Sequence, residues 1–355
     1  MNWFCDWLTL FVRCEAGREI NDGSVVFLKA DGAVEYSVDR RLMLAGSFDE
    51  RVAVRAETGG IISISGNPLK FFQGHNLWGS SDVHGLAAAM TIDVVARLEG
   101  VELSGAELQE LYELGPRLTR VDCTCMFKLP SGKVQGFLEV LGGAIGGGRQ
   151  RVQDIGSFDG KTVYIGKTSR RVSQKFYDKG VEFRKHPPAL ACRLADIPME
   201  QLTGYAGDAL RYELVLRGME LKRLELEHAS QWTPETGAGL MGERLGKISM
   251  LDNLALADEE RLELPRKLHA VYALWLDGFE LRTHYRKSQF YTLRRELLAY
   301  GIDIAKTRPR LVRTEGEPYP LGASLRSFLA ATMETPAWAE GSSLSYRPAA
   351  VQKVS

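Results

Sequence analysis

Alternation of apolar and polar residues dominates the first two thirds of the chain, which is the pattern of strands with one buried face. Turn pairs such as Asp31-Gly32 and Gly59-Gly60 interrupt the alternation and indicate hairpins. Segments with apolar residues at helical spacing lie between the alternating ones. The predicted strands cover residues 3–12, 24–38, 51–65, 118–128, 162–166, 172–179 and 209–217, and the predicted helices cover 82–98, 104–114, 133–145 and 219–229.

Residues 66–79 (GNPLKFFQGHNLWG) interrupt this pattern with a stretch rich in Gly, Asn and Pro. Such composition predicts a loop. The same stretch carries Phe71, Phe72, Leu77 and Trp78. Because large apolar side chains are unfavourable in water, we expect this loop to fold back onto the protein.

From about residue 230 the spacing of apolar residues changes from a period of 2, typical of strands, to a period of 3.6, typical of helices. Apolar residues in 268–279 recur at the spacing of an amphipathic helix, and a second helix is predicted over 287–300. We therefore predict three parts: a first domain over 1–235, a helical domain over 236–310 and an extended, partly disordered tail over 311–355.

Composition adds that the chain is globular. It has 355 residues, of which 45% are hydrophobic and 25% charged, and its 45 basic residues balance 45 acidic ones. No apolar run is long enough for a membrane helix, and the apolar N-terminus, interrupted by Asp6, is expected to be a strand and not a signal peptide. Five scattered cysteines suit a reducing cytoplasm better than a disulfide framework.

Basic residues cluster in two places despite the neutral total. Residues 161–185 hold eight basic residues against two acidic ones, and residues 281–313 hold nine against two. Aromatic residues are interleaved in both clusters, which favours a polyanion partner over a merely solvated face. The predicted DNA contacts are Arg170, Arg171, Lys287, Arg294 and Arg295, the last three on the second C-terminal helix.

Several catalytic motifs are absent from the sequence. Gly166-Lys167-Thr168 ends like a phosphate-binding loop, but Lys161 stands where that motif needs a glycine. No two histidines are separated by a single residue, no Cys and His spacing suits zinc, and no nucleophile elbow occurs. A nucleoside triphosphatase, a zinc site and a Ser hydrolase are therefore excluded.

Polar residues inside the predicted strands remain as candidate chemistry. Alternation places Lys175, Tyr177 and Lys179 on one face, and two nearby ammonium groups are expected to help Tyr177 ionise. Asp6, Asp122 and Glu213 each interrupt an apolar strand. Alternation places Asp122 on one face with Arg120 and Thr124, and Glu213 on one face with Arg211. Such carboxylates are either salt-bridge partners or, if they converge, oxygen ligands for Mg²⁺ or Mn²⁺.

Four segments of the chain carry a resemblance to the gene II replication initiators of filamentous phages, and a more distant one to plasmid rolling-circle initiators without the His–hydrophobe–His motif. GNPLKFFQGHNLWGSSD (66–82) resembles the family's NPxKxxQGHNxFG loop, and LTRVDCT (118–124) resembles its ISRIDxT strand. KFYDKGVEF (175–183) resembles the strand with its nicking tyrosine, and LRYELVLRGMEL (210–221) its VRFExR strand. Residues 268–304 look like the separate domain that ends phage members.

The resemblance implies that the protein nicks the plus strand at a phage origin, forms a 5′-phosphotyrosine link and later rejoins the displaced strand. It implies Tyr177 as nucleophile, Lys175 or Lys179 as its helper, and Asp122, Glu213 and Asp6 as ligands of Mg²⁺ or Mn²⁺. His75 is a candidate metal ligand or acid/base, with a loop-fixing hydrogen bond as the alternative.

We therefore expect an α+β fold, with a curved, mainly antiparallel sheet, helices on one face and a small helical C-terminal domain. The expected partners are double- and single-stranded origin DNA, host helicase and host polymerase, in the host bacterial cytoplasm and without a membrane. The competing hypothesis is a non-catalytic origin-binding or regulatory DNA-binding protein. A tyrosine recombinase is disfavoured because no array of Arg and His accompanies the tyrosine.

Overall fold

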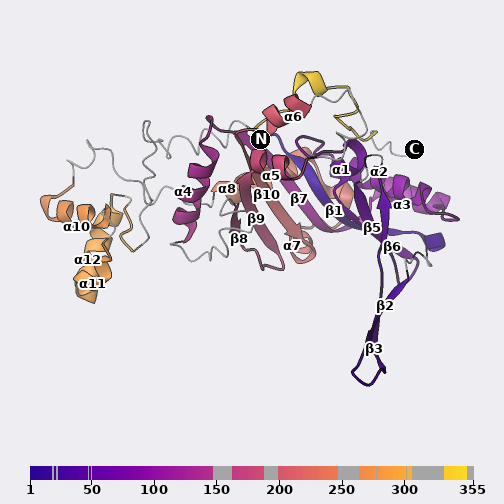
Figure 1. The fold of residues 1–355 in the computed structure, drawn as a ribbon, viewed down its shortest axis with the longest axis horizontal. Coiled ribbons are helices and arrows are strands. Elements are labelled where there is room, and N and C mark those ends of the chain that lie inside the picture. The colour runs from indigo at the N-terminus through magenta and orange to yellow at the C-terminus, as the bar shows by residue number, and fades with distance from the viewer. Residues whose placement is uncertain are drawn as a thin grey trace.

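The computed structural model describes residues 1–17, 20, 23–46, 48, 50–146, 162–187, 199–246, 264–276, 279–300, 302–305 and 332–349. These residues form a large antiparallel sheet with helices, and a separate group of C-terminal helices (Figure 1). The predicted α+β class is confirmed. None of the described helices has the length and apolar character needed to cross a membrane.

Among the described residues, eight strands form one antiparallel sheet in the order β4-β5-β6-β1-β7-β10-β9-β8. β1 pairs with β6 and β7, and β10 pairs with β7 and β9, so strands far apart in sequence meet at the centre. The short β4 was not predicted, because four residues are too few for alternation to stand out. The bounds are β1 (Phe4–Arg13), β4 (Leu42–Ala45), β5 (Arg51–Glu57), β6 (Ile61–Gly66), β7 (Arg117–Lys128), β8 (Thr162–Ile165), β9 (Val172–Asp178) and β10 (Ala209–Arg217).

The two faces of this sheet differ because side chains alternate along each strand. One face carries apolar residues such as Leu8, Leu10, Leu214 and Leu216, which are buried in the main core. The helices that contribute to that core include α2 (Val83–Ala96), α3 (Gly105–Glu113), α4 (Val134–Gly146), α7 (Gly218–Arg223) and α8 (Pro234–Gly246). The opposite face, called the polar face below, carries Trp7, Thr9, Phe11, Arg120, Asp122, Thr124, Arg211, Glu213, Lys175 and Tyr177.

The apolar loop over 66–79 contains a short helix, α1 (Pro68–Gln73), where we predicted loop throughout. The Asn67 side chain accepts from the Lys70 backbone N–H at 2.9 Å and caps the start of the helix. Gly74 ends it with a φ of 78°, a left-handed conformation that glycine adopts without strain. Leu69 and Phe71 are buried in the main core, so the expectation that this segment folds back is confirmed.

A second, smaller core covers one end of the polar face. It joins Met126 at the end of β7 to α5 (Lys179–Lys185), α6 (Met199–Ala206) and the C-terminal segment. Tyr346 of that segment stacks on Phe72 with ring centroids 4.2 Å apart. The prediction of an extended tail is therefore wrong for residues 332–349, which pack against the first domain, and residues 306–331 lie outside the described part.

The C-terminal helices have a core of their own. α10 (Arg266–Leu276), α11 (Leu281–His284) and α12 (Lys287–Leu298) pack through buried Leu268, Tyr272, Trp275, Phe290 and Leu297. This agrees with the helix pair predicted from the 3.6-residue period.

The first domain extends further than predicted. Helix α8 begins at Pro234, and its Met241 and Leu245 are buried in the main core. Gly237 of α8 lies so close to Trp3 that a Cβ there would come within 2.1 Å of the indole ring. The predicted boundary at 235 therefore falls inside this domain, which continues at least to Gly246.

β2 (Ser24–Leu28) and β3 (Val34–Asp39) form a separate two-stranded ribbon that extends away from the sheet (Figure 1). Its apolar side chains are exposed, and Phe27 and Tyr36 stack on each other at 4.3 Å between ring centroids. The predicted hairpin around Asp31-Gly32 is confirmed.

Candidate active site

Three neighbouring strands bring four of the predicted site residues, Lys175, Tyr177, Asp122 and Glu213, together on the polar face. In the register of β9, β10 and β7, Tyr177 lies opposite Arg211, and Glu213 lies between Lys175 and Thr124. Asp122, two residues from Thr124, points to the same side and is diagonal to Glu213. The faces predicted from alternation for β7 and β10 are thus seen in the sheet.

Tyr177 and Glu213 form the closest contact of this cluster. The Tyr177 hydroxyl donates to Glu213 Oε1 at 2.7 Å. Lys175 Nζ lies 3.5 Å from Glu213 Oε2 and 4.1 Å from the centre of the Tyr177 ring. All three side chains therefore occupy one small polar site.

The environment of Tyr177 opposes the easy ionisation that we expected from its lysine neighbours. Burial raises the pKa of Tyr177 well above its usual value, and Glu213 adds to the increase. The charge of Arg211 lowers the pKa of Tyr177, but by less than burial raises it. The phenol therefore keeps its proton unless a neighbouring group accepts it, and Glu213 is the group in hydrogen-bond contact.

Arg211 organises the cluster, and the sequence analysis did not assign it a role. Its side chain is fully buried and contacts Asp6 Oδ2 at 2.6 Å, Glu213 Oε1 at 2.9 Å and the Asn76 carbonyl oxygen at 2.5 Å. The only sign of this role in the sequence was that Arg211 shares a strand face with Glu213. Because an unpaired buried charge is costly, these three acceptors hold the guanidinium in place.

Asp6 reaches the same cluster from a bulge in β1, between Cys5 and Trp7. Besides Arg211, its Oδ1 accepts from Asn67 at 2.7 Å and from Asn76 at 2.8 Å. Burial by itself would raise the pKa of Asp6, but Arg211 and the amide donor of Asn76 outweigh it and lower the pKa to about 2. The structure thus gives Asp6 a set of protein partners that hold it ionised.

Asp122 behaves differently from Asp6. The Asp122 carboxylate accepts hydrogen bonds from Arg120 Nε at 2.8 Å and from Arg120 Nη2 at 2.7 Å. The pKa of Asp122 is nevertheless raised to about 6. Burial is the largest cause, and the negative charges of Glu213 and Asp6 add to it. Glu213 and Asp6 therefore lie close enough to Asp122 to disfavour its charge.

A divalent ion would find a limited set of ligands here. Within the described part of the chain, no group of three His, Cys, Asp or Glu side chains is arranged to hold one ion. Asp122 and Glu213 remain as a pair of carboxylates on one face. Because Mg²⁺ is commonly held by one or two carboxylates together with substrate phosphates, this donor pair fits such an ion once DNA is bound.

His75 is buried away from this chemistry. Its Nε2 lies 2.9 Å from the Leu344 carbonyl oxygen, which can only accept, so Nε2 carries the proton and Nδ1 accepts from the Leu77 N–H at 3.3 Å. Burial lowers the pKa of His75 to about 3. Both ring nitrogens are engaged within the protein, which corresponds to the loop-fixing alternative.

Lys179 does not share the strand face of Tyr177, because β9 ends at Asp178 and Lys179 begins α5. Its ammonium is buried and donates to Asn76 Oδ1 at 3.0 Å and to Glu182 Oε2 at 2.5 Å. Burial lowers the pKa of Lys179 to about 8. Lys179 thus supports Asn76, whereas Lys175 is the lysine beside the tyrosine.

The predicted DNA contacts fall on two surfaces. Arg170 and Arg171 are exposed just before β9, and Arg171 Nε lies 3.2 Å from the buried Glu220. Lys287 and Arg295 are exposed on α12. Arg294 instead forms a two-bond pair with the buried Asp303, at 2.6 and 2.7 Å. The other basic residues of the second cluster, Lys306, Arg308, Arg310 and Arg313, lie outside the described residues.

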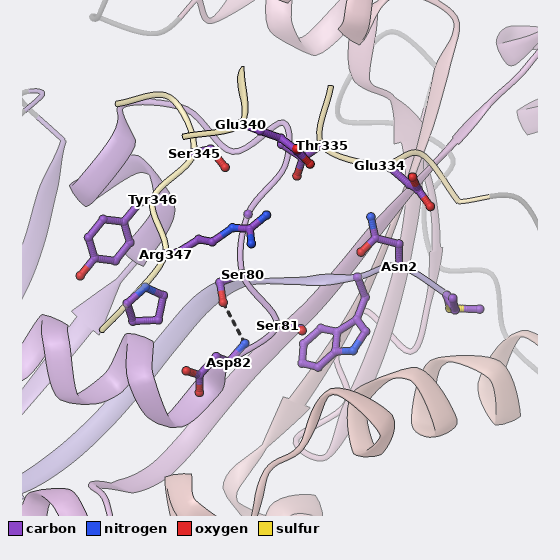
Figure 2. A pocket seen from close by; sticks show the side chains of 14 residues that line it. Asn2, Ser80, Ser81, Asp82, Glu334, Thr335, Glu340, Ser345, Tyr346 and Arg347 are labelled. Carbon is purple, nitrogen blue, oxygen red and sulfur yellow. Dashed lines mark hydrogen bonds between the residues drawn. The ribbon is translucent and has the colours of Figure 1, made fainter. Parts of the chain in front are cut away.

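A polar pocket of about 700 Å³ lies elsewhere, between the N-terminus, the start of α2 and the C-terminal segment. Figure 2 shows Asp82, Ser80, Arg347 and Glu334 around it, and the Asp82 N–H donates to Ser80 Oγ at 3.0 Å. None of the predicted site residues lines it.

Comparison with known proteins agrees with the resemblance seen in the sequence. Residues 4–235 match the model of the N-terminal part of the gene II replication-associated protein family, and residues 256–315 match the model of its C-terminal part. The chain therefore belongs to the family of gene II replication-associated proteins.

One curated relative and one solved structure illustrate the match. The replication-associated protein of this family from Enterobacteria phage I2-2 is 30% identical over 318 residues, covering 86% of this chain and 89% of the relative. The rolling circle replication initiator protein from Geobacillus stearothermophilus is 16% identical, with a TM-score of 0.30, covering 68% of this chain and 84% of that one.

Proposed function

We propose that this protein nicks and rejoins the plus strand of a phage origin, with Tyr177 as the nucleophile. The observation that supports this most directly is the hydrogen bond from the Tyr177 hydroxyl to Glu213 Oε1. A nucleophile in contact with a base, and a cation beside both, is the arrangement that activates weakly acidic hydroxyl groups. Membership of the gene II family supplies the substrate class, which is origin DNA.

In the nicking step the Tyr177 oxygen forms a bond to the scissile phosphorus while its proton passes to Glu213 Oε1. The bond between phosphorus and the 3′ oxygen breaks, and that oxygen takes a proton from solvent. Lys175 is placed to stabilise the negative charge that develops on the phosphoryl oxygens. The product is a 5′-phosphotyrosine, which conserves a phosphodiester-like bond.

Rejoining is the reverse of nicking. A free 3′ hydroxyl attacks the phosphotyrosine and gives up its proton to solvent, the bond between phosphorus and the Tyr177 oxygen breaks, and Glu213 returns the proton to that oxygen. Because each step exchanges one phosphoester for another, closure needs no nucleoside triphosphate. This agrees with the lack of a phosphate-binding loop motif in the sequence.

Asp122 and Glu213 are the residues that would hold Mg²⁺ or Mn²⁺, and Asp6 lies beside them as the third predicted ligand. Such an ion, when bound, polarises a non-bridging phosphate oxygen. In this arrangement Asp122 supplies a carboxylate whose charge the site otherwise disfavours. Asp6 contributes mainly by holding Arg211, which in turn holds Glu213.

The exposed basic residues of α12 would bind duplex origin DNA, and Arg170 and Arg171 would contact phosphates nearer the sheet. Host helicase and polymerase are the partners that would unwind and extend from the nick, in the bacterial cytoplasm. The alternative is a non-catalytic origin-binding or regulatory protein that uses the same basic surfaces.

The test is to incubate purified protein with Mg²⁺ and supercoiled origin DNA, and to map any covalent adduct. The proposal expects a nicked circle with protein on the 5′ end, attached at Tyr177, and no adduct in Tyr177→Phe. An adduct that persists in Tyr177→Phe would assign another nucleophile. Origin binding without any nick would favour the non-catalytic alternative.

A further inference from the structure

Beyond the carboxylates, β1 places two aromatic side chains on the polar face, where water-exposed strands usually carry polar ones. Trp7 and Phe11 both lie on this face of β1, four residues apart, and both are only partly buried. At the rise of a strand this places them roughly 13 Å from each other. Neither ring belongs to the hydrophobic cores formed by the described residues, so these aromatic positions call for another explanation.

An arginine accompanies each of these rings. Arg120 of β7 places its guanidinium carbon 5.0 Å from the centre of the Trp7 ring, and Arg117 places its own 4.7 Å from the centre of the Phe11 ring. Flat pairs of this kind attract a third flat group, because nucleobases stack both on aromatic faces and on guanidinium planes.

A third arginine extends the positive charge toward the catalytic tyrosine. Arg217 of β10 lies directly opposite Arg120, and its Nη1 donates to Ser173 Oγ at 3.0 Å, a neutral partner. Burial lowers the pKa of Arg217, the charge of Arg120 adds to the decrease, and Asp122 opposes it. Arg120 already shares its charge with Asp122, whereas the Arg217 guanidinium is hydrogen-bonded to a neutral hydroxyl, so a phosphate beside Arg217 would be stabilised.

We propose that Trp7, Phe11, Arg117, Arg120 and Arg217 bind the unpaired strand next to the scissile phosphate. The bases stack on the two aromatic–arginine pairs and the phosphates lie against the guanidinium groups. Stacking of this kind needs bases free of a complementary strand, so the ligand is single-stranded DNA of any sequence and not duplex. The inference rests on the proposed function and adds to it the path of the substrate across the sheet.

The order of the rows on the sheet gives this path a direction. Starting from Tyr177 and Glu213, the strand passes Asp122 and then the row formed by Arg120 and Arg217. On β1, Trp7 lies beside Asp122 and Phe11 lies beside Arg117, so the two aromatic–arginine pairs flank these rows and lead away from the smaller core that covers the other end of the polar face. A single strand held in this way presents one phosphate to Tyr177.

The test measures binding without cleavage, in full-length protein that carries Tyr177→Phe. The probes are a fluorescein-labelled oligothymidine of twelve nucleotides and a duplex of twelve base pairs. Trp7→Leu and Phe11→Leu keep apolar volume but remove the flat ring, and Arg217→Gln removes one charge. Tyr36→Leu on the exposed ribbon and Arg97→Gln at the end of α2 are matched controls.

Each Leu variant is expected to weaken oligothymidine binding about tenfold, with duplex binding within about twofold of the parent. Arg217→Gln should weaken binding and reduce the slope of log affinity against log salt by about 0.7, the value for one phosphate of a single strand. The controls should bind like the parent.

Unchanged oligothymidine affinity in folded Trp7→Leu, Phe11→Leu and Arg217→Gln would overturn the inference, and so would an equal loss for duplex. These outcomes are independent of the nucleophile, because every protein in the comparison lacks the Tyr177 hydroxyl. Nicking by Tyr177→Phe would contradict the proposed nucleophile. The oligothymidine affinities would still decide whether these residues bind single-stranded DNA.

Discussion

Tyr177 and Glu213, on the neighbouring strands β9 and β10, are joined by a hydrogen bond of 2.7 Å from the phenol hydroxyl to Glu213 Oε1. The pair lies on a face where burial raises the pKa of the tyrosine, so its reactivity depends on the carboxylate beside it. Glu213 is also one of the two carboxylates placed to hold a metal. The two roles can be separated by experiment.

Glu213→Gln should reduce single-turnover nicking by at least about a hundredfold, because an amide cannot accept the phenol proton. If Glu213 acts as the base, raising the Mg²⁺ concentration will not restore the rate, whereas a variant that only loses a ligand would be partly rescued. Glu57→Gln, at a surface pair with Arg55, is the control and should nick like the parent. A full rescue by metal would assign Glu213 to the ion alone.

The nicking rate should rise with pH through about 6. Asp122 has its pKa raised to about 6, so it is protonated below that value and ionised above it, and only the ionised form can bind a cation. Arg120 opposes this increase, so Arg120→Gln should move the midpoint to higher pH. The measurement is single-turnover cleavage at saturating DNA across the range from acidic to mildly basic pH. A profile that is flat across this range would contradict the role of Asp122.

Asp6→Asn should lower stability more than it changes chemistry. It leaves the buried Arg211 with one carboxylate partner fewer, and breaking a buried ion pair costs about 3–5 kcal/mol. Because the pKa of Asp6 is lowered to about 2, its contribution to stability is present above its unfolded pKa and is lost as pH falls toward 2. Urea unfolding measures the change.

The control for this variant is Asp93→Asn, which removes a surface pair with Arg97 on α2 and should cost under about 1 kcal/mol. Normal stability of Asp6→Asn together with lost metal-dependent cleavage would instead make Asp6 a metal ligand.

Two neighbouring arginines of α12 should behave differently when replaced by Ala. Arg295 is exposed, so Arg295→Ala should weaken duplex binding and reduce the salt slope by about 1. Arg294 pairs with the buried Asp303, so Arg294→Ala should mainly destabilise the C-terminal helices. Salt-dependent duplex affinity and thermal melting separate the two. Nicking of a single-stranded oligonucleotide above its dissociation constant should stay near the parent rate for Arg295→Ala.

Lys175→Ala should show the reverse behaviour, because Lys175 contacts Glu213 and the Tyr177 ring. It should slow the cleavage of single-stranded and supercoiled substrates alike, with duplex affinity within about twofold of the parent. A loss confined to duplex binding would remove Lys175 from the active site.

Removing residues 332–355 should lower the melting temperature and expose the loop around α1. The Leu344 carbonyl accepts from both His75 Nε2 and Trp78 Nε1, and Tyr346 covers Phe72. Without the segment, these buried polar groups lose their acceptor and the aromatic rings meet water. Thermal melting and proteolysis between Gly66 and Gly79 test this. Equal stability of the shortened chain would show that the segment only rests on the domain.

Hydrophobic alternation was enough to predict most of the strands and the face of β7, β9 and β10 that carries the polar residues. Alternation placed Asp122, Glu213 and Tyr177 on polar faces because a period of two is a property of the extended backbone. The same local logic predicted the C-terminal helix pair, whereas helix α8 and the domain boundary were missed because burial against Trp3 is a long-range contact. The family resemblance came from short sequence motifs, which can be recognised without knowing the fold.

Which of these residues meet, and in what protonation state, depends on the packing of distant segments. Arg211, Asn67 and Asn76 entered the site through contacts with Asp6, which lies far from all three in the chain. His75 proved to be bound to Leu344, 269 positions later. The pKa of Tyr177 is high because its side chain is buried, and an isolated strand would leave that side chain in water. Strand pairing and burial arise only when distant segments come together, and for that reason the sequence could propose the catalytic residues but not their partners.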